Sequence, residues 1–190
     1  MTRERDEFDI EHMRCLAEGD DLALNRLMDA WSQALIVYLT RLTGSETTAQ
    51  DLAQETFVRV YRHRLAFRPS QKFSTWLFAI ATNLARNHAR WRARHPETLL
   101  EHKNLRELPV AAQTSAPDEQ TMANERVAAI QKALSEVPHD MREVLILSTW
   151  HGMSHAEIAR VQDTSEKAVE VRLYRARKLL RDLLSDHLRS

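Results

Sequence analysis

The chain has 190 residues, of which only three are glycine and five are proline, so the composition predicts long helices and excludes a turn-rich β-sandwich or barrel. The scattered glycines exclude a glycine-rich nucleotide loop, and the single cysteine excludes an internal disulfide and a zinc site with two thiolates. The net charge is zero but segregated: residues 1–55 carry five basic and twelve acidic side chains, and residues 56–96 carry nine basic and no acidic ones. This segregation predicts separate faces for anionic and for other partners.

Helical periodicity dominates the first half of the chain. Apolar residues recur at three- and four-residue steps, which predicts helices at about 8–19, 21–44, 47–64 and 74–92. Aspartates at 20 and 21 suit the start of the second helix, and Gly44 suits its end. These elements predict an N-terminal four-helix domain over residues 1–96.

Residues 97–123 lose this periodicity and contain two prolines, a pattern that is typical of a linker. A second helical unit is expected over residues 124–190. It contains a helix to Glu136, a break at Pro138, a helix to Trp150 and two further helices. The sequence therefore predicts an all-α protein with two small helical domains joined by a flexible linker.

The last two helices follow a helix-turn-helix pattern. Ser154 and Glu157 form a capping box at the start of a short helix that ends near Val161. Residues 162–164 predict a turn in which Asp163 adopts a left-handed conformation, and a longer basic helix follows from Ser165 or Glu166. The second helix of this motif can enter a DNA major groove. A solvated face of a bundle helix is the alternative reading of its basic residues.

The basic block at residues 56–96 also holds seven of the twelve aromatic residues. Asn83, Arg86, Asn87, Arg90 and Arg94 share one stripe of the fourth predicted helix. Cations, amides and nearby aromatic rings suit a separated DNA strand, because phosphates need cations and unstacked bases need flat faces. Several of these rings are expected in the core, whereas Phe67 and Phe73, in the preceding loop, suit stacking on a base as well as core packing.

Two sets of motifs together resemble the bacterial RNA polymerase sigma factors of the extracytoplasmic-function (ECF) group. The motifs are Asp51-Leu-Ala-Gln54-Glu55-Thr-Phe57-Val58, Phe73-Ser-Thr-Trp76-Leu77, Leu134-x-x-x-Pro138, Arg142-Glu-Val144-Leu145 and Ser154-x-x-Glu157-Ile158-Ala159. The resemblance implies a sigma region 2-like domain and a sigma region 4-like helix-turn-helix domain. It also implies a factor that binds core RNA polymerase and promoter DNA, recognises two promoter elements, assists strand opening in a stress or envelope response, and has an anti-sigma factor as a partner.

The resemblance also assigns roles to individual residues. Core polymerase would contact an exposed face of the third helix, beside Phe57 and Val58, which are expected to be buried. The residues implied for core polymerase are Asp51, Gln54 and Glu55. Those implied for the melted minus-ten element are Arg68, Lys72, Phe73, Ser74, Asn83, Arg86 and Arg90. Those implied for the minus-thirty-five element are Lys167, Glu170, Val171, Arg172 and Arg175. Glu170 departs from the family pattern, and its carboxylate suits the amino group of a cytosine better than a phosphate.

Two alternative functions account for part of the sequence. A stand-alone helix-turn-helix transcription regulator explains residues 154–181 but leaves the central basic block unused. A sigma-mimicking adaptor that binds an anti-sigma factor needs no arginine stripe. No nucleophile with a nearby base and no metal-binding set of histidines stands out, so we expect no enzymatic activity, no cofactor and no metal. The chain shows no apolar stretch for membrane insertion, and a cytoplasmic location is expected.

Overall fold

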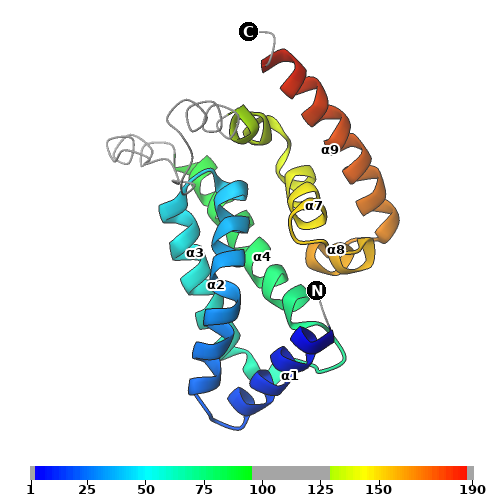
Figure 1. Cartoon of the computed structure of the whole chain (residues 1–190). Coiled ribbons are helices and arrows are strands. Elements are labelled where there is room, and N and C mark those ends of the chain that lie inside the picture. Colours follow the sequence, from blue (N-terminus) through cyan, green and yellow to red (C-terminus); the bar gives the residue numbers. More distant parts are fainter. Residues whose placement is uncertain (1–2, 96–128, 188–190) are drawn as a thin grey trace, which may run out of the picture.

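The structure, a computed structural model, describes residues 3–95 and 129–187, and all regular elements in these ranges are helical (Figure 1). The elements are α1 (Arg3–Ala17), α2 (Leu22–Thr43), α3 (Glu46–Arg62), the 3-10 turn η1 (Arg64–Ala66), α4 (Phe73–Arg94), a helix at 129–136, α7 (His139–Thr149), α8 (His155–Gln162) and α9 (Glu166–His187). The prediction of an all-α protein is confirmed. The predicted linker at 97–123 lies outside the described residues.

Local capping explains where several helices begin and end. Gly44 ends α2 in a left-handed conformation with φ 76°, and its N–H donates to the carbonyl of Thr40, as the sequence predicts. The Ser45 hydroxyl accepts from the N–H of Thr48, so α3 begins slightly earlier than predicted. The first helix also begins earlier, at Arg3 instead of Phe8.

The N-terminal unit, α1 to α4, packs around buried polar pairs as well as apolar side chains. The hydroxyls of Tyr38 on α2 and Thr82 on α4 lie 2.7 Å apart, and both side chains are buried. The indole N–H of Trp31 on α2 donates to a carboxylate oxygen of Asp9 on α1 at 2.8 Å. Because these two bonds join α1 to α2 and α2 to α4, they fix how the three helices meet.

The C-terminal unit, residues 129–187, packs α9 against α7 and α8. Val169, Leu173 and Ala176 of α9 are buried, as their helical spacing predicts. No described helix in either unit has the length and apolarity to cross a lipid bilayer.

The two units pack directly against each other, with α8 on α4 and α7 on α2 (Figure 1). This contact surface is named the seam below. His151, in the turn after α7, lies against the rings of Tyr38 and Phe78, with centroid distances of 5.7 and 4.6 Å. Burial and the nearby Arg41 lower the pKa of His151 to about 4. The imidazole is therefore neutral in the folded chain at physiological pH.

Candidate nucleic-acid interface

The residues predicted to meet core polymerase lie on the solvent side of α3. Asp51 and Gln54 are exposed, and Glu55 is partly exposed and forms an ion pair with Arg59 at 2.9 Å. The opposite side of α3 carries the buried Leu52 and Phe57. The predicted side chains therefore share a face that is open to a partner.

Two exposed apolar side chains, one on this face of α3 and one in η1, were not identified from the sequence. Val58, which was expected to be buried, is 37% exposed, and Leu65 in η1 is 77% exposed. The expectation for Val58 is wrong because it lies one turn after Gln54, on the same exposed side of α3. The four-residue spacing between Gln54 and Val58 was the signal in the sequence that Val58 lies on the exposed side of the helix. Exposed apolar side chains beside polar ones are typical of a protein-binding surface.

The stripe on α4 forms a polar surface only along part of its length. Asn83, Asn87 and Arg90 are exposed, and a guanidinium nitrogen of Arg90 donates to the amide oxygen of Asn87 at 2.7 Å. Arg68 is also exposed, in the loop before α4. These side chains present cations and amides to solvent, as the sequence predicts.

Phe73 and Ser74 do not belong to this surface. They are 1% and 2% exposed. The ring of Phe73 packs edge-on against Trp31 and Phe67, with centroids 6.1 Å apart in each case. Both side chains pack in the core because the first turn of α4 faces inward toward α2, and their contact with DNA stays a prediction.

Two cations of the α4 surface are paired with carboxylates across the seam. The Arg86 guanidinium donates to both carboxylate oxygens of Glu143 on α7, with an Nε to Oε1 distance of 2.8 Å. The Lys72 ammonium, just before α4, lies 2.9 Å from a carboxylate oxygen of Glu157 on α8. The predicted minus-ten residues thus divide into three groups: two that are buried in the N-terminal unit, three that are exposed without a partner among the described residues of the C-terminal unit, and two cations that are paired with the C-terminal unit, of which Lys72 is still 45% exposed.

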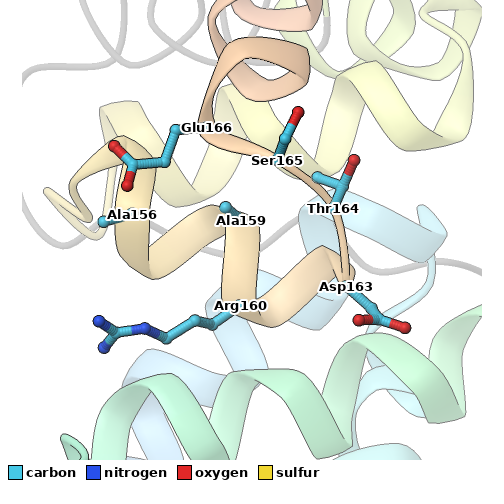
Figure 2. Close-up of a pocket in the computed structure, with 7 residues that line it drawn as sticks. All are labelled: Ala156, Ala159, Arg160, Asp163, Thr164, Ser165 and Glu166. Carbon is cyan, nitrogen blue, oxygen red and sulfur yellow. The ribbon is translucent and has the colours of Figure 1, made fainter.

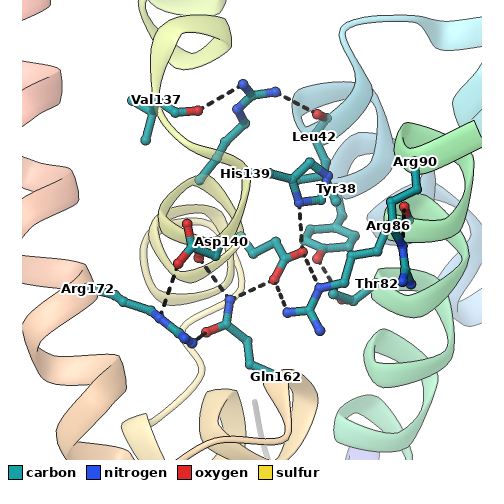
Figure 3. A network of polar contacts seen from close by, with 12 residues as sticks. Tyr38, Leu42, Thr82, Arg86, Arg90, Val137, His139, Asp140, Gln162 and Arg172 are labelled. Carbon is teal, nitrogen blue, oxygen red and sulfur yellow. Dashed lines mark hydrogen bonds and ion pairs between the residues drawn. The ribbon is translucent and has the colours of Figure 1, made fainter. Parts of the chain in front are cut away.

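Glu143 is the centre of a buried polar network, and Figure 3 labels its partners Arg86, His139 and Gln162. Its side chain is 0% exposed, and it also contacts His139 Nδ1 at 2.9 Å and accepts from the side-chain amide of Gln162 at 2.6 Å. Burial raises the pKa of the Glu143 carboxyl, but the bonds from His139 and Arg86 outweigh burial and lower it overall. The carboxylate is therefore ionised and fully engaged.

The same network reaches α9 through Gln162. The amide oxygen of Gln162 accepts from a guanidinium nitrogen of Arg172 at 2.7 Å, and Arg172 Nε lies 3.3 Å from a carboxylate oxygen of Asp140 (Figure 3). Arg172 thus faces α7 and α8 and not the outer side of α9. These bonds give Arg172 a positioning role within the C-terminal unit, and its contact with the minus-thirty-five element stays a prediction.

The geometry of the helix-turn-helix is the one that the sequence predicts. The Ser154 hydroxyl accepts from the N–H of Glu157 at 3.3 Å, and the Glu157 carboxylate accepts from the N–H of Ser154 at 2.8 Å. Asp163 has φ 52° and ψ 58°, and the Ser165 hydroxyl accepts from the N–H of Ala168 at the start of α9. The turn leaves a shallow hollow of about 400 Å³ between α8 and α9 (Figure 2). Its lining residues are Ala156, Ala159, Arg160, Asp163, Thr164, Ser165 and Glu166.

The outer side of α9 presents the remaining predicted residues. Lys167, Glu170, Val171 and Arg175 are all exposed. The Lys167 ammonium lies 2.9 Å from a Glu170 carboxylate oxygen, and this bond lowers the pKa of Glu170. Tyr174, which is 72% exposed on the same side, extends this surface by one turn. The side chains of α9 can therefore offer a cation, a carboxylate, an apolar group and an aromatic ring to one groove.

Among the described residues, no group of histidine, cysteine, aspartate and glutamate side chains is arranged to hold a metal ion.

Two family models match the chain in the order of its two units: sigma-70 region 2 at residues 27–95 and sigma-70 region 4 at residues 128–180. The RNA polymerase sigma-H factor of Pseudomonas aeruginosa is 30% identical over 193 residues, which cover 100% of this chain and 98% of that protein. The ECF RNA polymerase sigma-E factor of Haemophilus influenzae is 28% identical over 167 residues, with 86% and 88% covered. The solved structure of CnrH in complex with the cytosolic domain of CnrY is 28% identical, with a TM-score of 0.70 over 94% of this chain and 98% of that one. The chain belongs to the sigma-70 family of RNA polymerase sigma factors, in its extracytoplasmic-function group.

Proposed function

We propose that this sigma factor reads two promoter elements with two separate surfaces, one on α4 and one on α9. As a sigma factor, the chain binds core RNA polymerase and directs initiation at specific promoters. The observation that carries the proposal is the pair of exposed polar helix faces, one in each unit. We assign residues 1–96 to the minus-ten and polymerase surface, 97–123 to a linker and 124–190 to the minus-thirty-five surface.

On α4 and in the loop before it, the proposed ligands of the melted minus-ten element are Arg68, Lys72, Asn83, Arg86 and Arg90. Cations bind phosphates regardless of sequence, and an amide such as that of Asn83 can pair with the edge of an unstacked base. A surface with both groups favours a separated strand over a duplex. It therefore supports a role in strand opening.

On α9, the proposed ligands of the minus-thirty-five element are Lys167, Glu170, Val171 and Arg175. A carboxylate is repelled by phosphate but accepts a hydrogen bond from the amino group of cytosine, and one good base contact is worth about 1–3 kcal/mol of discrimination. We propose that Glu170 reads a base and that Lys167 orients it through their ion pair.

For core polymerase, the proposed contact is the exposed face of α3 with Asp51, Gln54 and Glu55. The exposed Val58 supports this assignment, since an apolar side chain among polar ones suits a protein partner. CnrH was solved with the cytosolic domain of CnrY, and we propose that an anti-sigma factor likewise binds this chain, which acts in the cytoplasm. We further propose that it serves a stress or envelope response and has no catalytic activity of its own.

Run-off transcription with core polymerase on a genomic fragment library tests the proposal. The wild-type chain should select a set of promoters, and permanganate should detect unpaired thymines in their minus-ten regions. Arg90→Ala should weaken strand opening more than duplex binding. Arg26→Ala, which removes an exposed cation from α2, is the matched control. Equal footprints for both variants would contradict the minus-ten assignment, and a chain that binds DNA but not core polymerase would favour a stand-alone regulator.

Selection from a randomised upstream element tests the second surface. Glu170→Lys should raise general DNA affinity and relax the preference at one position of the selected motif. An unchanged motif would show that Glu170 does not face the bases.

A further inference from the structure

An exposed tryptophan lies in the last turn of α4, outside the apolar core. Trp91 is 43% exposed, and the imidazole of His95 stacks on its indole with the ring centroids 4.8 Å apart and the planes inclined by 22°. His95 Nδ1 also donates to the carbonyl of Trp91 at 2.9 Å, because a carbonyl can only accept. The stacking and this bond hold both rings in one orientation and leave part of a flat, apolar indole in contact with solvent.

Trp91 borders the cationic stripe of α4. It follows Asn87 by four residues and precedes Arg94 by three, and side chains at these spacings are neighbours on a helix surface. Both neighbours are exposed, as is Arg90. Residues 56–96 contain no acidic side chain, so the charges that α4 places around the indole are all positive. An aromatic face beside cations suits a nucleic acid strand, whose base stacks on the ring while its phosphates meet the cations.

A second ring pair, on α1, shows that an aromatic residue stacked on a histidine does not by itself indicate nucleic acid. Phe8 is 37% exposed, its ring centroid lies 4.0 Å from that of His12, and His12 Nδ1 donates to the Phe8 carbonyl at 2.7 Å. The exposed neighbours at the same two spacings are Glu4 and Glu11, whose carboxylates repel phosphates. The same local geometry thus occurs in opposite charge surroundings, and only those of Trp91 suit DNA.

The position of Trp91 along α4 fits a strand that the stripe already holds. Trp91 follows Asn83 by eight residues, which corresponds to about 12 Å along the helix axis. Successive nucleotides of one strand are about 3.4 Å apart along a duplex axis, so this length equals about three to four nucleotides. A strand with one base at Asn83 can therefore pass Arg90 and place a further base at Trp91.

We propose that Trp91 is a base-stacking residue, on which an unpaired base of the opened promoter lies against the indole face that His95 does not cover. His95 is its positioning residue, and Arg90 and Arg94 bind the adjoining phosphates. The inference rests on the proposed minus-ten role of α4. Because every base has a flat face, stacking on Trp91 adds affinity for the open strand and little preference among bases.

Two substitutions at Trp91 distinguish a flat ring from apolar bulk. Trp91→Phe keeps an aromatic face, whereas Trp91→Leu keeps apolar bulk without one. Phe8→Leu makes the matched change on α1 and is the control. Circular dichroism checks the folding of each full-length variant, and fluorescence anisotropy without DNA checks its binding to core polymerase. Should Trp91→Leu fail to fold, Trp91→Met makes the same comparison.

The probe is 2-aminopurine, an adenine analogue that brightens when it leaves the base stack and is quenched when it stacks on an aromatic ring. It replaces successive bases of the minus-ten strand in a promoter bound by core polymerase and the full chain. In the wild type, one position within the permanganate-reactive region should stay quenched. Trp91→Leu should make this position bright and weaken binding to a single-stranded minus-ten oligonucleotide about tenfold. Trp91→Phe and Phe8→Leu should retain both the quenching and the affinity.

Three results would overturn the inference: a wild-type fluorescence pattern in Trp91→Leu, the same loss in Trp91→Phe, or a lower affinity of Trp91→Leu for core polymerase before DNA is added. The last result would assign Trp91 to a protein interface. If the pattern is unchanged in Trp91→Leu while Arg90→Ala still weakens strand opening, the stacking role fails and the proposed function stands. If Asn83→Ala and Arg90→Ala both leave strand opening unchanged, the proposed minus-ten surface itself fails.

Discussion

The helices α4 and α9 have the same length, 22 residues, and each carries a basic stripe, yet their cations have different surroundings. Lys167 and Arg175 on α9 are exposed on its outer side, whereas Arg86 on α4 is bound to the buried Glu143. The comparison shows that a stripe in the sequence does not say which of its cations remain exposed. Packing against a second unit decides this.

The contrast also exists within α4. Arg86 and Arg90 lie one turn apart, but Arg86 pairs across the seam, whereas Arg90 bonds to the Arg86 carbonyl and to Asn87 of its own helix. Substituting each arginine in turn distinguishes an arginine that stabilises the fold from one that is exposed and available to a ligand.

The largest expected effect follows from removing Arg86. Arg86→Ala leaves the Glu143 carboxylate buried without its guanidinium partner, so the free energy of unfolding should fall by about 3 kcal/mol. Arg90→Ala is the matched control and should stay within about 0.5 kcal/mol of the wild type. Urea denaturation followed by circular dichroism measures both. Similar losses in the two variants would contradict the contrast between them.

The second effect is a loss of stability in acid that depends on His151. Its pKa is about 4 in the folded chain and 6.5 when unperturbed, so between these values the unfolded chain binds the extra proton. The free energy of unfolding should therefore fall as the pH drops from about 6.5 to about 4, by on the order of 3 kcal/mol from this group. In the His151→Phe variant, this part of the pH dependence should be absent. Denaturation experiments at several pH values between about 4 and about 7 measure the free energy of unfolding of both chains.

Asp9 supplies a contrast of opposite sign in the N-terminal unit. Burial raises its pKa to about 6, although the Trp31 indole N–H and Arg5 oppose the shift. The folded chain therefore binds the extra proton between about 4 and 6, and its stability from this group falls as the pH rises through that range. Asp9→Asn should remove this fall and leave the effect of His151 intact. Identical pH profiles for the wild type and both variants would refute these assignments.

A smaller effect is expected at the start of α8. Ser154→Ala removes the hydroxyl of the capping box and should lower the free energy of unfolding by about 1 kcal/mol. Ser185→Ala, at an exposed position in α9, provides the comparison and should change it by less than about 0.5 kcal/mol. Thermal unfolding of the two variants side by side resolves the difference.

The smallest effect on stability is expected on α3. Replacing Gln54 and Glu55 with alanine breaks only the partly exposed pair with Arg59, worth about 0.5 kcal/mol. Affinity for core polymerase, measured by fluorescence anisotropy, should fall about tenfold if two interface contacts are lost. Normal affinity per folded molecule would remove this face from the proposed interface.

Features that depend on neighbouring residues could be predicted from the sequence. The end of α2 at Gly44, the capping box at Ser154 and the left-handed Asp163 each require only residues within one turn. The basic stripe of α4 and the outer side of α9 follow from helical periodicity. For the same reason, the order of the helices and the helix-turn-helix motif could be predicted from the sequence.

Features that depend on distant residues could not be predicted. Arg86 and Glu143 are 57 positions apart, and nothing in either segment indicates the partner. Phe73 was expected to suit base stacking as well as core packing, and its burial depends on Trp31 of another helix. Arg172 has the spacing of a groove-facing residue, but Asp140 and Gln162 hold it on the inner side. A single sequence does not indicate which distant residues will be in contact in the fold.

The pairing of Lys72 and Arg86 with carboxylates has a consequence for how the free protein is distributed in a cell. Each cation that contacts a phosphate releases counterions and strengthens non-specific attachment to the chromosome, with a slope of about 0.9 per contact in the logarithm of affinity against salt. In the free chain Lys72, just before α4, and Arg86, on α4, are engaged by carboxylates, which removes two such contacts. Fewer molecules are then retained on random chromosomal sites, and more remain in solution to compete for core polymerase.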